Sequence, residues 1–139
     1  MNETIMRLQE TIVTSLASAI PQAWERIVVN YEMEEQEGGA IIHNRLGFYI
    51  AKDAGGNLHK AELRVGSEVE DMFRDMSDEF QRTVGERWGT CDLIVDPPGK
   101  FRFDFSYDPP KRINGVLDDD SYGRFGRYLE TYKAECAKT

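Results

Sequence analysis

The sequence predicts an α+β fold built on a mainly antiparallel sheet. Two observations carry this prediction. Residues 101–108 alternate strictly between aromatic and polar side chains, which is typical of a strand with one buried face and one exposed face. Residues 69–84 instead repeat apolar side chains at helical spacing. Strands and helices thus occur in separate runs, an order that favours α+β architecture.

The N-terminal quarter predicts a helix followed by a strand. Apolar residues recur at steps of three and four from Ile5 to Ile20, and Pro21 ends the helix. From Ile27 the period changes to two, which predicts a half-buried strand with a wet face formed by Arg26, Asn30, Glu32 and Glu34.

Short apolar runs predict the middle of the sheet. Residues 40–42 and 46–51 indicate two strands that follow a polar turn at 35–39. Residues 53–57 form a further turn, and residues 58–65 fit either a strand or an extended connection. Three or four strands are therefore expected before the central helix.

The central helix has a predicted start and end. Ser67 and Glu70 have the spacing of a capping box, and Gly85 suits a left-handed helix terminator. Its apolar stripe is expected to cover the aromatic face of the hairpin that residues 88–108 form around Pro98-Gly99. The predicted core comprises Trp24, Phe73, Phe80, Trp88, Phe101, Phe103, Phe105 and Tyr107.

The C-terminal residues predict an irregular connection at 109–115 and then a helix. Asp118–Asp120 can cap this helix, and Tyr122, Phe125, Leu129 and Tyr132 follow at helical spacing. With 139 residues the chain has the length of one domain, which we expect to span residues 1–139.

Composition restricts the classes of partner. The 17 basic and 25 acidic residues give a formal net charge of −8, which argues against binding to nucleic acid or to an anionic membrane and favours a basic partner. Two cysteines do not make a disulfide framework, so a reducing cytoplasmic setting is expected. The sequence has no apolar run of about twenty residues that could span a membrane.

Groups for catalysis or cofactor binding are not apparent. His43 and His59 lack ligand partners at helical spacing, and Cys91 alternates onto an apolar face. No catalytic residue, cofactor or metal site is therefore predicted. The run Asp118–Asp120 leaves three interpretations open: helix capping, an acidic patch for a partner, or a divalent cation site.

Acidic side chains are the candidates for contact with a partner. A negative patch can capture a basic protein and speed its association, although charged runs are commonly only a solvated surface. The candidate residues are Glu32, Glu34, Asp104, Asp108, Asp118, Asp119 and Asp120.

The order of several motifs resembles the YezG-like immunity proteins, which are bacterial antitoxins. The resemblance spans roughly residues 5–108, and the tail 109–139 is only loosely similar. It rests on Ile20-Pro21 with Trp24, the acidic helix around 69–80, Trp88, the Gly99-Lys100-Phe101 turn and the strand Phe103–Asp108. Ser106 departs from the acidic residue that members often have there.

The resemblance implies a non-catalytic cytoplasmic protein that binds the C-terminal domain of a secreted polymorphic or contact-dependent toxin. The toxin is expected to be a basic nuclease. The sequence leaves a monomer or a homodimer open, since an exposed edge strand could pair two copies. Two alternatives stay open at this point: a small-ligand or metal-binding module that uses an open sheet face and the Asp118–Asp120 run, and an adaptor with an acidic face.

Overall fold

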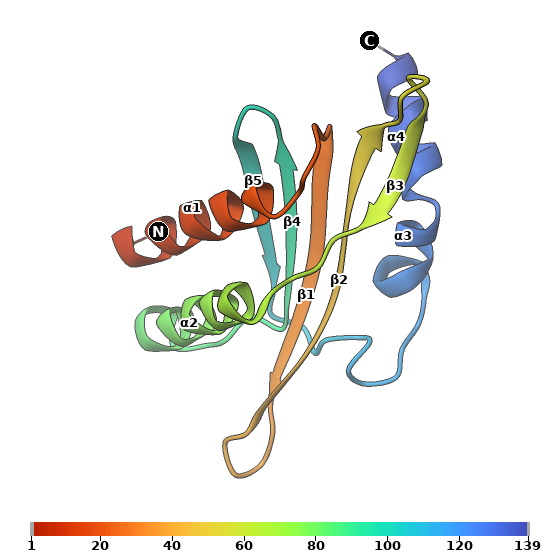
Figure 1. Ribbon diagram of the computed structural model, residues 1–139. Helices are drawn as coiled ribbons and strands as arrows, with labels where there is room; N and C mark the ends of the chain where they lie inside the picture. Colours follow the sequence, from red (N-terminus) through yellow and green to blue (C-terminus); the bar gives the residue numbers. More distant parts are fainter. Residues whose placement is uncertain (1, 139) are drawn as a thin grey trace.

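A five-stranded antiparallel sheet forms the centre of the fold (Figure 1). The computed structural model describes residues 2–138. The strand order is β3-β2-β1-β4-β5, which puts β1 in the middle and leaves β3 and β5 at the edges. The strands are β1 (Arg26–Glu35), β2 (Ile41–Lys52), β3 (Leu58–Glu62), β4 (Thr90–Asp96) and β5 (Lys100–Ser106).

Helices cover both faces of this sheet (Figure 1). One face carries α1 (Glu3–Ser18) and α2 (Ser67–Val84), and the other carries the C-terminal helices. The C-terminal helical region is divided into a π-helix η1 (Asp119–Gly123), α3 (Arg124–Gly126) and α4 (Tyr128–Ala137). The predicted α+β arrangement with N-terminal, central and C-terminal helices is confirmed.

The main core lies between the sheet and the pair α1 and α2. Phe73 is fully buried and stacks on Tyr31 with ring centroids 4.4 Å apart. Phe80 meets Phe105 at 4.7 Å, so α2 covers the hairpin as expected. Of the predicted core, Phe73, Phe80 and Trp88 are buried. Four further members are partly buried and pack against the main core: Trp24, Phe101, Phe103 and Phe105.

The prediction that Tyr107 belongs to the core is wrong. Its side chain is 41% exposed, because β5 ends at Ser106 and the chain turns away before residue 107. The alternation of side chains in the sequence therefore continues past the end of the strand.

The middle of the sheet differs from the prediction in one respect and agrees with it in another. Residues 41–52 form one long strand, since the polar stretch around Asn44 keeps its pairing with β1. The strand option for residues 58–65 is confirmed for Leu58–Glu62.

The start of α2 is as predicted, but its cap is not. Gly66 is the N-cap residue, and no side chain caps the helix. The Gly66 carbonyl accepts hydrogen bonds from the amides of Val69 and Glu70, so Ser67 is the first helical residue. At the other end Gly85 adopts φ 88°, which confirms the predicted left-handed terminator.

Candidate functional site

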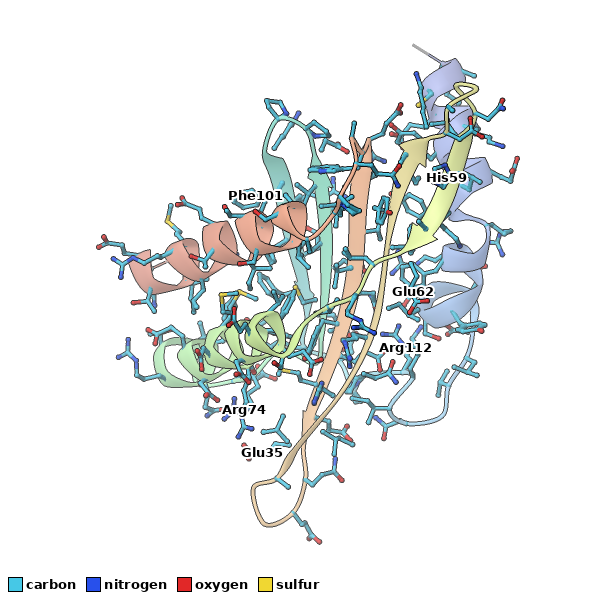
Figure 2. The ribbon with its side chains drawn as sticks, viewed as in Figure 1. Glu35, His59, Glu62, Arg74, Phe101 and Arg112 are labelled. Carbon is cyan, nitrogen blue, oxygen red and sulfur yellow. The ribbon has the colours of Figure 1, made fainter. Side chains whose placement is uncertain are left out.

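A buried ion pair fixes the C-terminal segment on the outer face of the sheet. Arg112 lies in the connection that follows β5, and its guanidinium is 3.3 Å from the Glu32 carboxylate on β1. The two side chains are only 5% and 2% exposed. The backbone amides of Arg112 and Ile113 also donate to the Glu32 carboxylate, at 3.1 and 2.9 Å. Figure 2 shows Arg112 on the outer side of the sheet.

Further hydrogen bonds complete the surroundings of this pair. The Arg112 guanidinium donates to Asn30 Oδ1 at 2.6 Å, to Asn44 Oδ1 at 2.8 Å and to the carbonyl of Ser121 at 3.0 Å. Burial lowers the pKa of Arg112, because desolvation outweighs the attraction of Glu32 and Asp92. A buried charge pair is tolerated when such hydrogen bonds satisfy its remaining groups. We therefore assign Glu32 and Arg112 a structural role.

The prediction that one face of β1 is exposed to solvent is consequently wrong. Residues 27–33 are buried on both faces of the strand, and Asn30 and Glu32 are 2% and 1% exposed. The covering segment includes Phe125, which packs on Phe48 with ring centroids 6.4 Å apart. Glu32 cannot contact a partner while this segment is in place.

The acidic run Asp118–Asp120 is occupied by ion pairs. Lys111 lies 2.9 Å from Asp118 and 3.2 Å from Asp120, and Arg127 pairs with Asp119. Asp118 also caps η1 by accepting from the Ser121 amide. The bond from Lys111, together with this amide, lowers the pKa of Asp118 to about 2. Among residues 2–138 no group of three or more potential ligands is arranged to hold a metal ion.

A hollow of about 270 Å³ lies where the end of β1, residues 87–89 and the connection after β5 meet, with Ile41 of β2 and Gln81 of α2 also in its lining. We call it the acidic hollow. Glu34, Glu35 and Asp108 supply its carboxylates, and Tyr107 and Trp88 supply its aromatic surface. Figure 2 places Glu35 at the end of the sheet where the β1–β2 hairpin projects. The structure thus brings two predicted partner-binding residues, Glu34 and Asp108, to one site.

Gly89 allows the wall of the acidic hollow to form. A Cβ atom at this position would lie 2.3 Å from the carbonyl oxygen of Asp108, so only glycine lets the two segments approach this closely. The Gly89 amide donates to the Ser106 carbonyl at 2.8 Å, and its own carbonyl accepts from the Met33 amide at 3.0 Å. These bonds hold residues 107–110 next to the end of β1.

The electrostatic balance of the acidic hollow is negative. Arg87 is its basic lining residue, and its guanidinium is already paired with Glu35 at 3.2 Å and with Asp78. Burial opposes the charge on Arg87, but these two carboxylates outweigh it and raise the pKa of Arg87. Neither Glu34 nor Asp108 forms an ion pair with any basic side chain of residues 2–138. The acidic hollow can therefore accept a cationic group.

Tyr107 adds an exposed aromatic ring to the acidic hollow. Desolvation and the nearby Glu86 charge raise the pKa of its hydroxyl, so the phenol stays neutral at neutral pH. An amphipathic ring of this kind provides a large rigid contact area with a polar end. Tyr107 and Arg87 are not predicted as site residues, since strand alternation places Tyr107 in the core and no local pattern marks Arg87. Glu35 belongs to an acidic cluster at one strand end in the sequence but is not among the candidate residues named from it.

Asp104 lies away from the acidic hollow. It projects from the outer face of β5, where it is paired with Arg102 at 2.9 Å. The outer face of β1 to β3, which a ligand-binding module would need open, carries the helices α3 and α4 (Figure 1). None of the helices formed by residues 2–138 has the length and apolar character needed to cross a membrane.

Comparison with protein families gives one finding. A family model described as "Immunity protein YezG-like" matches residues 5–128, which is most of the 139-residue chain. The match extends beyond the resemblance at 5–108 and includes Arg112 and Asp118–Asp120. A comparison with curated proteins gave no match.

Proposed function

The chain belongs to the YezG-like immunity protein family, and on this premise we propose that it neutralises one cognate toxin by forming a stoichiometric complex. The family supports an immunity role. The further proposal is that the partner is the C-terminal domain of a secreted polymorphic or contact-dependent toxin, met in the cytoplasm. The chain acts by occupying the toxin surface and needs no catalytic group for this.

The acidic hollow is the observation that carries the proposed mode of binding. Glu34 and Asp108 line it together with the exposed Tyr107 ring, and neither carboxylate has a cationic partner among the described residues. Within residues 2–138, the Glu34 carboxylate accepts hydrogen bonds only from the neutral amides of Gln36 and Asn114, at 3.2 and 3.0 Å. Binding hot spots commonly combine an aromatic anchor with surrounding polar groups, and opposite charges speed the encounter of two proteins. Enzymes that act on nucleic acid present a basic surface to the phosphate backbone. A basic nuclease is therefore the toxin class that fits the hollow and the net charge of −8 best.

The other predicted contact residues have a smaller part in this proposal. Asp118, Asp119 and Asp120 are already neutralised by neighbouring cations, and Glu32 is buried. Carboxylates that are already paired with cations of the same chain attract a basic partner less strongly than unpaired ones. We therefore centre the proposed toxin surface on Glu34, Tyr107 and Asp108.

The proposal predicts that Glu34→Lys combined with Asp108→Lys slows association with the toxin by about tenfold or more. Reversal of these charges removes electrostatic attraction without removing a core side chain. Association rates of the purified proteins give the direct measurement. Protection of growth during co-expression with the toxin domain encoded beside this gene gives the cellular one.

A matched control is the pair Asp71→Lys and Asp75→Lys, which changes the net charge equally on the exposed side of α2. Neither aspartate has an ion pair among the described residues. If this control slows association as much as the first pair, overall charge governs the encounter and the acidic hollow loses its assigned role. If the unaltered chain neither binds nor protects, the immunity mechanism itself is wrong.

A further inference from the structure

Among residues 2–138, no strand pairs with the outer side of the edge strand β5. It is hydrogen-bonded to β4 alone, in a continuous one-to-one register from Lys100 to Ser106. Strands at a sheet edge are usually protected by proline, by a bulge, by charged side chains or by a covering segment, because their free amide and carbonyl groups can pair with another strand. Proline is absent from β5, and its pairing register has no bulge. The other edge strand, β3, is shorter and has α4 packed beside it.

The side chains of β5 form a symmetric pattern around Phe103. Arg102 and Asp104 flank it on the outer face, where they are 68% and 61% exposed. Phe101 and Phe105 flank it on the inner face, where all three rings are only partly buried. Each inner ring contacts the next, with centroids 5.7 Å apart for Phe101 and Phe103 and 6.2 Å for Phe103 and Phe105. Apolar surface therefore remains open along the edge.

We propose that two copies of this chain pair antiparallel along β5, with Phe103 on the two-fold axis. In this register Arg102 of each copy lies opposite Asp104 of the other, and Phe101 lies opposite Phe105. The contact is isologous, so every pair occurs twice. Cross-strand pairs of opposite charge and of aromatic rings both stabilise antiparallel strands. The two five-stranded sheets become one continuous ten-stranded sheet.

Neighbouring registers are excluded by charge. A shift of the axis to Arg102 would place this arginine opposite its own copy, and a shift to Asp104 would do the same for the aspartate. Like charges directly opposite each other destabilise paired strands. An axis between two residues would set the aromatic face of one strand against the charged face of the other. Centring on Phe103 places opposite charges on one face and aromatic rings on the other over residues 101–105. This complementarity identifies a second copy as the partner of the edge.

The proposal can be tested by reversing the charges of Arg102 and Asp104, first one at a time and then in combination. Sedimentation velocity of the full chain over a wide concentration range should show a reversible dimer. Arg102→Asp and Asp104→Arg should each weaken self-association by about tenfold or more, because each puts two like-charge pairs at the contact. A mixture of these two single variants should recover association as a mixed dimer. The double variant, which keeps the composition and net charge, should recover it alone.

Arg7→Asp is the matched control, since it changes the charge equally in an exposed ion pair on α1. It should leave self-association unchanged. The proposal is overturned if the unaltered chain stays monomeric at every concentration, or if the single reversals associate as well as it does. Failure of the mixture to recover association overturns this register. Deuterium exchange that slows with concentration in residues 100–106 supports it, whereas equal exchange at all concentrations contradicts it. These measurements use the chain without the toxin, so their results do not depend on the proposed function.

Discussion

Replacing Arg112 with alanine is expected to lower the free energy of unfolding by about 3–5 kcal/mol, because the change leaves the Glu32 charge buried without its cation. The pair is almost completely enclosed, and Arg112 also donates to Asn30, Asn44 and the Ser121 carbonyl. Its loss should loosen the segment that covers the outer face of β1. Urea unfolding followed by circular dichroism gives the measurement.

Arg7→Ala is the control for this change. Arg7 pairs with Glu3 at 3.4 Å, and both side chains are largely exposed at 72% and 88%. Exposed pairs of this kind contribute between zero and about 1 kcal/mol. Similar losses of stability for the two arginine variants would show that the buried pair does not hold the C-terminal segment in place.

Phe73→Ala is expected to destabilise the fold by a similar amount, about 3–5 kcal/mol. Phe73 is fully buried on α2 and stacks on Tyr31 of the central strand with an interplanar angle of 14°. Removing the ring leaves a cavity between the helix and the middle of the sheet, which the surrounding backbone cannot close. Thermal and denaturant unfolding both report the loss.

Tyr107→Ala provides the contrast. Sequence alternation places Tyr107 in the same core as Phe73, but the ring is 41% exposed at the acidic hollow. Its truncation should cost less than about 1 kcal/mol of stability while it weakens toxin binding. A loss of stability as large as that of Phe73→Ala would place Tyr107 in the core after all.

The inner side of the fold could be predicted from the sequence because each element there has a characteristic spacing of apolar residues. Residues 101–106 alternate in a strand that has one covered face, and the stripe on α2 matches a helix that packs on that face. Local periodicity is sufficient to predict an element when the residues at its apolar positions are also the ones that are buried. The strands and the helix therefore appear close to their predicted positions.

The outer side could not be predicted in the same way. Asn30 and Glu32 have the polar character of solvent-facing residues, yet both are buried by a segment about 80 positions later in the chain. Arg112, which compensates their burial, lies in a stretch without periodicity. Only the tertiary contact distinguishes a buried polar network from an exposed acidic face.

The acidic hollow was predicted in part. Glu34 and Asp108 were candidates because of their charge, but their common site depends on the close approach of Gly89 to the Asp108 carbonyl. No spacing rule relates these three positions. Asp118–Asp120 shows the opposite case, in which a conspicuous acidic run is taken up by Lys111, Arg124 and Arg127.

Titration of toxin activity with the purified chain tests the central claim most directly. Stoichiometric neutralisation predicts that the remaining activity of the cognate toxin domain falls linearly and reaches its minimum at one chain per toxin molecule. Full activity in the presence of excess chain would contradict the claim. So would complete inactivation by a small fraction of an equivalent, since a chain that turns over many toxin molecules acts as a catalyst and does not neutralise by binding.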